Sequence, residues 1–170
     1  NFNETYTKID NIAALRLLTS ATDKAPVYDV RAWYSTNTKG GGIFWYDVSD
    51  TTTADDGFLT IVDGSSRRWK RIIGAAGVNA YMAGAKGDGL IDGSGVVTGT
   101  DDTTALNTRC TYLRNSVYLS ADIAPVAVRI GPGVFRCNST INLANITGAR
   151  WELDGRGTTI ASRASGKPAL

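Results

Sequence analysis

Short apolar runs separated by sharp turns fill the sequence after Pro125, and this feature constrains the fold most. The sharpest turns are Gly131-Pro132-Gly133 and Asp154-Gly155-Arg156-Gly157. Strands this short cannot each close a hairpin and bury both faces, so they favour a solenoid whose coils stack. Two coils at most fit here, too few for periodicity to prove a solenoid. The predicted strands are Ala127–Ile130, Val134–Cys137, Thr140–Leu143, Arg150–Leu153 and Thr158–Ala161.

A glycine-rich segment and a helix are predicted before these strands. Val78–Met82 reads as one strand, and Gly84–Gly99 reads as an irregular loop. Asp101 or Asp102 is expected to cap a helix that ends near Tyr118. The apolar residues of this helix recur at steps of four, three and four and form one stripe: Leu106, Cys110, Leu113 and Val117.

The first part of the chain predicts a small antiparallel sheet at about residues 9–74, followed by a hinge at Gly74–Gly77. Asp10 is a candidate cap for a short helix over Asn11–Leu18, which would pack against the sheet. The turn Ser35–Gly42 contains three consecutive glycines. The four predicted strands are rich in β-branched and aromatic residues: Val27–Tyr34, Ile43–Val48, Phe58–Val62 and Arg68–Ile73.

Charge and composition exclude several classes of function. With 18 basic and 16 acidic side chains, the sequence lacks the basic clusters that bind nucleic acid, apart from Arg67–Arg71. A charge-guarded edge strand is the preferred interpretation of that segment, and docking to an acidic partner is the alternative. No apolar run is long enough to span a membrane. Histidine is absent, which excludes a Ser-His or Cys-His catalytic pair within these residues.

Aspartates in the second half invite a metal or catalytic interpretation, but a structural role is favoured. Asp88-Gly-Leu-Ile-Asp92-Gly lacks the middle ligand and the distal glutamate of a calcium loop. Aspartate also accepts hydrogen bonds from the free amides of tight turns and helix starts. We therefore predict no catalytic, cofactor or metal residues. The residues assigned to structural turns and caps are Gly84, Gly87, Asp88, Gly89, Asp101, Asp102, Gly131, Pro132 and Gly133.

A structural role is also favoured for the aromatic residues and the cysteines. For six aromatic residues, a place in the core or at a trimer interface is favoured over stacking on sugar rings, and the choice is left open. They are Trp33, Tyr34, Trp45, Tyr46, Trp69 and Trp151. Cys110 and Cys137 are too few for a disulfide framework and read as small buried hydrophobes.

The second half resembles the start of the pectate-lyase-like right-handed β-helices. The pattern comprises Gly84–Gly89, then Thr100–Leu106, then Ile130–Phe135, and Leu153–Gly157 resembles the family's next turn. The resemblance implies a glycine-aspartate loop followed by a helix that covers the open end of the solenoid. The sequence departs from the pattern by about ten inserted residues, Leu90–Gly99.

The first half resembles the particle-proximal domain that precedes the β-helix in many tailed-phage tailspikes. The matching segments are Gly40–Asp47, Ala54–Gly57 and Arg67–Arg71. The resemblance implies a homotrimer that is assembled in the host cytoplasm and carried on the virion tail, where it docks to a tail or baseplate protein. Its distal shaft would bind, and often depolymerise, host surface polysaccharide.

The expected fold is mainly β: a small antiparallel domain with a short helix, then a capping helix and the first coils of a right-handed parallel β-helix. We expect residues 1–76 to form the virion-proximal domain and residues 77–170 to form the cap and first coils. Both ends read as cut from something longer. The expected function is a non-catalytic link between virion and shaft. The alternatives are part of a depolymerase whose active site lies mostly beyond residue 170, or a secreted pectinase-like enzyme.

Overall fold

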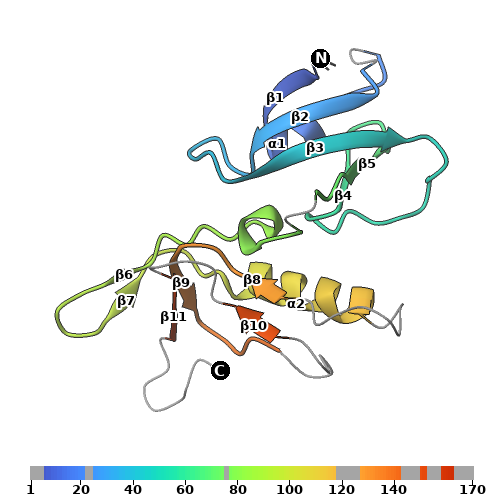
Figure 1. Cartoon of the computed structure of the whole chain (residues 1–170). Coiled ribbons are helices and arrows are strands. Elements are labelled where there is room, and N and C mark those ends of the chain that lie inside the picture. Colours follow the sequence, from blue (N-terminus) through green and yellow to red (C-terminus); the bar gives the residue numbers. More distant parts are fainter. Residues whose placement is uncertain are drawn as a thin grey trace, which may run out of the picture. The chain divides into compact units, whose positions relative to one another are not determined.

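The computed structural model describes residues 6–21, 25–74, 77–117, 127–142, 150–152 and 158–162. The chain divides into two compact units, Asn1–Gly77 and Val78–Leu170, and each is described by itself (Figure 1). Within the described part of the chain, neither helix combines the length and the apolar character that crossing a bilayer requires.

The first unit is built on one five-stranded sheet with the order β1-β2-β3-β5-β4. Strands β2, β3, β5 and β4 are antiparallel to their neighbours, whereas β1 runs parallel to β2 because α1 lies between them in the chain. The elements are β1 (Thr7–Asn11), α1 (Ile12–Arg16), β2 (Val27–Ala32), β3 (Gly40–Asp47), β4 (Thr60–Val62) and β5 (Arg68–Arg71).

The sequence pattern predicted four strands in this unit, and β1 was not among them. Its segment contains a single apolar residue, Ile9, so alternation gives no signal. The strand pairs with β2 through backbone groups, and most of its side chains are exposed. The prediction of the helix was also too long: α1 ends at Arg16, and Asn11 rather than Asp10 caps it, accepting a hydrogen bond from the Ala14 amide.

One face of the sheet, together with α1, encloses the core of the first unit. Alternate residues of each strand point inward, as Tyr28 and Val30 do on β2. The core also takes Ile12 and Leu15 from the helix. The inward aromatic and aliphatic residues of the other strands are Phe44, Ile61 and Trp69.

The glycine segment and the basic strand both differ from the prediction. Gly40–Gly42 belong to β3 and not to a turn, and β5 lies between β3 and β4 instead of at an edge. Arg71 points into the unit and is only 6% exposed, so the interpretation of a solvated, charge-guarded edge is wrong for it. Its guanidinium lies 4.4 Å from the Phe44 ring centre and donates to the carbonyls of Gly40, Gly41 and Phe58.

The second unit contains short strands and the longer of the two helices. The predicted strand Val78–Met82 is wrong because Ala80–Ala83 form one turn of 3-10 helix, capped by Asn79. The predicted irregular loop contains a hairpin. The elements are η1 (Ala80–Ala83), β6 (Leu90–Ile91), β7 (Val97–Thr98), α2 (Thr103–Val117), β8 (Ala127–Arg129), β9 (Gly133–Cys137), β10 (Arg150–Glu152) and β11 (Thr158–Ser162).

Two pairs of parallel strands in this unit form stacked coils. Strand β8 pairs with β10 and β9 pairs with β11, so Ala127 lies beside Arg150 and Gly133 beside Thr158. The step from one coil to the next is 150 − 127 = 23 residues in the first pair and 158 − 133 = 25 residues in the second. Consecutive strands that each pair in parallel with a strand one coil later define a solenoid rather than a set of hairpins. The predicted fold class is confirmed.

Other details of the coils are more limited than predicted. Residues 140–142 are not a strand, while Leu143 and the turn 154–157 lie outside the described residues. Helix α2 agrees with the prediction to Val117, and Tyr118 lies outside the described residues.

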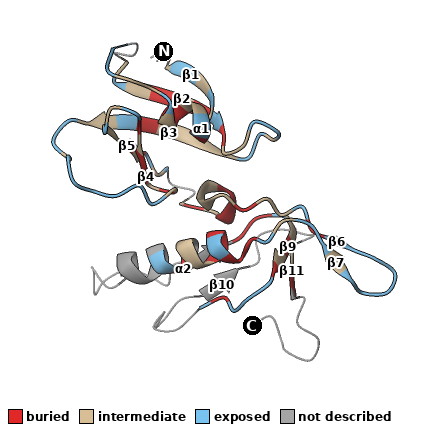
Figure 2. Ribbon diagram, turned by 180° about the vertical axis from the view of Figure 1, so that it is seen from behind, coloured by how far each residue is buried: buried red, intermediate tan, exposed pale blue. Residues whose placement is uncertain are grey.

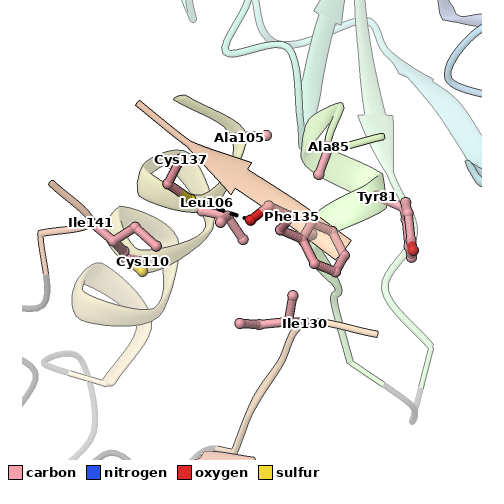
Figure 3. Packing of buried hydrophobic residues seen from close by; sticks show 10 residues of the cluster. Tyr81, Ala85, Ala105, Leu106, Cys110, Ile130, Phe135, Cys137 and Ile141 are labelled. Carbon is pink, nitrogen blue, oxygen red and sulfur yellow. Dashed lines mark hydrogen bonds between the residues drawn. The ribbon is translucent and has the colours of Figure 1, made fainter. Parts of the chain in front are cut away.

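The core of the second unit lies between β9, α2 and η1 (Figure 3). Phe135 and Cys137 point inward from β9, and Ile160 packs beside them from the next coil. Leu106 and Cys110 come from the predicted stripe of α2 and are buried. Cys110 and Cys137 are both buried and are not joined in a disulfide, as predicted for small hydrophobes.

Candidate functional site

The cap of the solenoid is formed where residues 88–102 cover the outer edge of β9. Peptide groups of a strand point alternately to its two edges, and one edge of β9 pairs with β11. On the other edge, the Gly89 amide donates to the Val134 carbonyl at 2.8 Å, and the Asp102 amide donates to the Arg136 carbonyl at 2.8 Å. This edge of the first coil is therefore occupied by the chain's own loops and is closed to a further strand.

Asp102 holds the cap together with its side chain. The residue is 1% exposed, and its two carboxylate oxygens accept from the Lys86 amide at 2.7 Å and the Gly87 amide at 3.0 Å. Burial raises the pKa of this carboxyl above its usual value, although the two amides oppose the shift. Because its side chain binds backbone amides of the glycine-aspartate loop, Asp102 joins that loop to the start of α2.

Asp88 and Asp101 bind the segments on either side of this junction. Asp88 accepts from the amide and the hydroxyl of Thr100, at 2.8 and 2.9 Å, and so closes the base of the β6–β7 hairpin. Asp101 accepts from the amide and the hydroxyl of Thr103, at the first turn of α2, and from the amide of Asn138 after β9. For both carboxyls burial raises the pKa, but these hydrogen bonds outweigh burial and the net pKa is lowered.

The glycines of the cap surround Tyr81, whose hydroxyl donates to the Pro132 carbonyl. A Cβ added to Gly87 or Gly133 would lie 2.8 or 2.7 Å from the Tyr81 hydroxyl oxygen, and both glycines have positive φ. A Cβ on Gly89 would lie 2.7 Å from Val134. Glycine is thus required where the loop approaches β9 closely.

The structure brings all the predicted cap residues together in the second unit. Gly84 ends η1 in the left-handed conformation, and Gly131 packs against the Tyr81 ring. Tyr81 was missed, because its segment was read as a strand. Asn107 of α2 was missed as well: its side chain donates to the Thr140 carbonyl and accepts from the Asn142 amide. No signal in the sequence marks it, since a single asparagine on a helix is ordinary.

The chemistry available at the cap is structural. Its carboxylates accept hydrogen bonds from backbone amides and threonine hydroxyls, and within the described residues no three His, Cys, Asp or Glu side chains form a metal-binding group. Asp92 lies apart, at the hairpin tip, where it accepts from the amides of Ser94 and Val96. The assignment of these residues to turns and caps stays a prediction.

Comparison with known proteins gives a match for the first unit. Residues 8–74 match the family described as the phage tail protein small four-stranded β-sheet domain. The four strands β2, β3, β5 and β4 fall within this range, as does β1 apart from its first residue.

Solved structures match both units together. WceF of Pantoea stewartii, described as a glycan biofilm modifying enzyme with a tailspike-like parallel β-helix fold, has a TM-score of 0.59 and 19% identity over 91% of this chain and 21% of its own. The tailspike gp49 of Acinetobacter baumannii phage Fri1, a capsular polysaccharide depolymerase, has a TM-score of 0.57 and 20% identity. The match covers 78% of this chain and 22% of gp49. Tailspike protein 2 of the Escherichia coli O157:H7 phage CAB120 has a TM-score of 0.55 and 19% identity. The match covers 81% of this chain and 15% of that protein.

The family match assigns residues 8–74 to a phage tail domain. The fold of the chain is that of the tailspike-like parallel β-helix structures: a small β-sheet unit is followed in the chain by stacked parallel coils. The chain spans about a fifth of the length of the solved structures that it matches.

Proposed function

We propose that this chain attaches a tailspike to the virion and starts the shaft that carries host-polysaccharide binding. The observation that carries the proposal is the order of the two units: a phage tail domain at residues 8–74 is followed by the cap segment and then by stacked parallel coils that begin at Ala127. Residues 1–76 act as the virion-proximal domain and residues 77–170 as the opening of the shaft. The protein acts as a homotrimer, assembled in the host cytoplasm and docked to a tail or baseplate protein.

Attachment is tested with particles of the encoding phage that were assembled without their tailspike. The purified chain, labelled with a fluorophore, is mixed with these particles and sedimented. We expect the chain to co-sediment with spike-deficient particles and to remain in the supernatant with complete particles, whose docking sites are filled. Equal recovery with both kinds of particle, or with neither, would contradict the proposal.

This region is proposed to have no catalytic activity of its own. Glycoside hydrolysis requires two carboxyl groups facing each other across a sugar-binding groove. The cap carboxylates Asp88, Asp101 and Asp102 instead accept hydrogen bonds from their own backbone. In the alternative, the intact protein is a depolymerase whose active site lies mostly beyond residue 170. A reducing-sugar assay on host capsular polysaccharide separates the two: turnover by this chain would contradict its proposed inactivity.

A further inference from the structure

The edge of the first unit's sheet at β4 is closed by the loop that precedes this strand. The Val62 amide donates to the Asp55 carboxylate at 3.0 Å, and the Thr60 amide donates to the Asp56 carboxylate at 2.9 Å. The Thr60 carbonyl accepts from the Asp56 amide at 3.2 Å. The outward backbone groups of β4 therefore have partners within the chain, and this edge does not accept a further strand.

The opposite edge of this sheet is β1 (Figure 1). The strand pairs with β2 on one side, and among the described residues no strand or loop hydrogen-bonds its other side. Lys8 is exposed, and the Asp10 side chain is 80% exposed. An open edge of this kind presents amides and carbonyls with which another extended segment can pair.

The register of the strands determines which backbone groups of β1 face this open edge. The Pro26 carbonyl accepts from the Tyr46 amide of β3, and because peptide groups alternate along a strand, those of Asp29 face β1. Asp29 lies beside Lys8 in the parallel register. In a parallel pair a residue bonds to the two neighbours of the residue opposite it and not to that residue. The amides and carbonyls of Lys8 and Asp10 therefore point away from β2.

The side chains of β1 indicate what kind of segment fits this edge. Lys8 and Asp10 lie on one face of the strand, and Ile9 lies between them on the other face, where it packs against the core. An added strand complements this pattern when it carries an acidic and a basic residue two positions apart, with an apolar residue between them. The charges then pair across the edge, and the apolar residue extends the core beside Ile9.

A second copy of this chain does not fit the edge within the proposed homotrimer. Because β4 is closed, two copies can add strands to each other only by pairing β1 with β1 about a two-fold axis. A two-fold pair does not close a ring of three copies, which requires two different edges on each copy. The open edge of β1 is thus left for a protein other than this chain.

We propose that β1 receives an extended segment of the tail or baseplate protein to which the chain docks, and that this segment adds to the sheet as a strand beside β1. The inference rests on the proposed attachment to the virion and assigns the contact that performs it. In strand addition of this kind, main-chain hydrogen bonds supply the affinity and alternate side chains supply the selectivity.

Two substitutions of Lys8 separate the backbone contribution from that of the side chain. Lys8→Pro removes the outward amide and leaves the bonds between β1 and β2 in place, because proline is accepted on the open side of an edge strand. Lys8→Thr is the matched control, since it removes the same charge but retains the amide and suits a strand. Circular dichroism verifies that both variants are folded.

Binding is measured by co-sedimentation with the spike-deficient particles over a series of chain concentrations. We expect Lys8→Pro to bind at least about thirtyfold more weakly than the unchanged chain, because one ladder bond is lost and the proline ring obstructs the added strand. Lys8→Thr should remain within about fivefold of the unchanged chain, as expected for the loss of one exposed ion pair.

Hydrogen exchange of the unchanged chain gives a second measurement that does not depend on any variant. The amides of Lys8 and Asp10 should exchange rapidly in the free chain and slowly in the chain recovered from particles, as mass spectrometry of peptides that contain β1 can show. The proposal is overturned if these amides stay unprotected on the particle, if Lys8→Pro binds as the unchanged chain does, or if Lys8→Thr loses binding equally.

Self-association of the unchanged chain that Lys8→Pro abolishes would also overturn the proposal, because a second copy would then occupy the edge. In each of these cases, binding of the unchanged chain to spike-deficient particles would still support the proposed function. Failure of the unchanged chain to bind these particles would instead contradict the proposed function, and the inference with it.

Discussion

At the scale of residues, the cap depends on side chains that replace missing backbone partners. Asp102 gives one carboxylate oxygen to each of two consecutive amides, those of Lys86 and Gly87, and this uses both of its oxygens as acceptors. A buried amide left without an acceptor costs about 1–3 kcal/mol. The aspartate type was predictable from the sequence. Its partners were not, because they lie 15 and 16 residues away in the chain.

Replacing Asp102 by asparagine should therefore destabilise the second unit by about 1–3 kcal/mol, because the amide nitrogen of asparagine cannot accept a hydrogen bond. Chemical denaturation followed by circular dichroism measures the change. Asp92→Asn is the matched control: its single accepting oxygen at the exposed hairpin tip is kept in asparagine, so stability should change little. Equal effects of the two substitutions would show that Asp102 is not the junction.

Acid should weaken the cap through Asp101. Burial raises the pKa of its carboxyl, but the hydrogen bonds from Thr103 and Asn138 outweigh burial and hold the pKa below 3.8 in the folded chain. The stabilisation is thus complete above the unfolded value and is lost as the pH falls through the lower folded value. The melting temperature of the unchanged chain should fall more steeply than that of Asp101→Asn between about pH 5 and about pH 2. Parallel curves would contradict this.

At the scale of elements, the β propensity of the sequence indicated where most strands lie. The pairing of strands in the sheet determines where each strand begins and ends. Strand β1 was invisible because its backbone, and not its side chains, makes its contacts. The inserted segment 90–99 was read as irregular because glycine dominates it. It forms the hairpin β6–β7, which is largely exposed (Figure 2). Leu90 of this hairpin is 70% exposed. The base of the hairpin is held where the Thr100 amide donates to Asp88 and where Arg136 donates to the Gly99 carbonyl.

Gly40–Gly42 of β3 and Arg71 of β5 form one hydrogen-bonded arrangement that was not predicted from the sequence. Arg71 donates to the carbonyls of Gly40, Gly41 and Phe58, and an added Cβ on Gly42 would lie 2.8 Å from its guanidinium. Burial lowers the pKa of Arg71 to about 10, so the residue remains a cation at neutral pH. Glycine repeats alone suggest a turn, and the long-range partner explains why they lie in a strand.

Lysine in place of Arg71 should destabilise the first unit by about 1.5–3 kcal/mol. The ammonium retains the charge but cannot donate to three separated carbonyls as the planar guanidinium does. Thermal unfolding provides the measurement. Arg31→Lys serves as the control because the Arg31 side chain is 58% exposed, and it should leave the transition unchanged. An equally small effect of both substitutions would remove Arg71 from this role.

At the scale of the whole molecule, two units with different strand chemistry follow one another. The first is a mostly antiparallel sheet with a helix on one face, and the second is a solenoid closed at one edge by its own cap. The order of these units could be predicted because turn residues and motif spacing are local. The register between coils could not, since it depends on contacts 23 and 25 residues apart in short strands.

Parallel stacking of β9 on β11 is the central claim, and site-directed disulfide formation tests it most directly. Val134 lies opposite Thr159, whereas Ala161 lies two residues further along and pairs with Arg136. Adjacent strands are about 4.8 Å apart, within the range that a disulfide spans. Cys110 and Cys137 are buried and should not compete. Mass spectrometry after mild oxidation should find efficient linkage in the Val134→Cys, Thr159→Cys pair and little in the Val134→Cys, Ala161→Cys pair. Preferential linkage in the second pair, or none in either, would contradict the stacked coils.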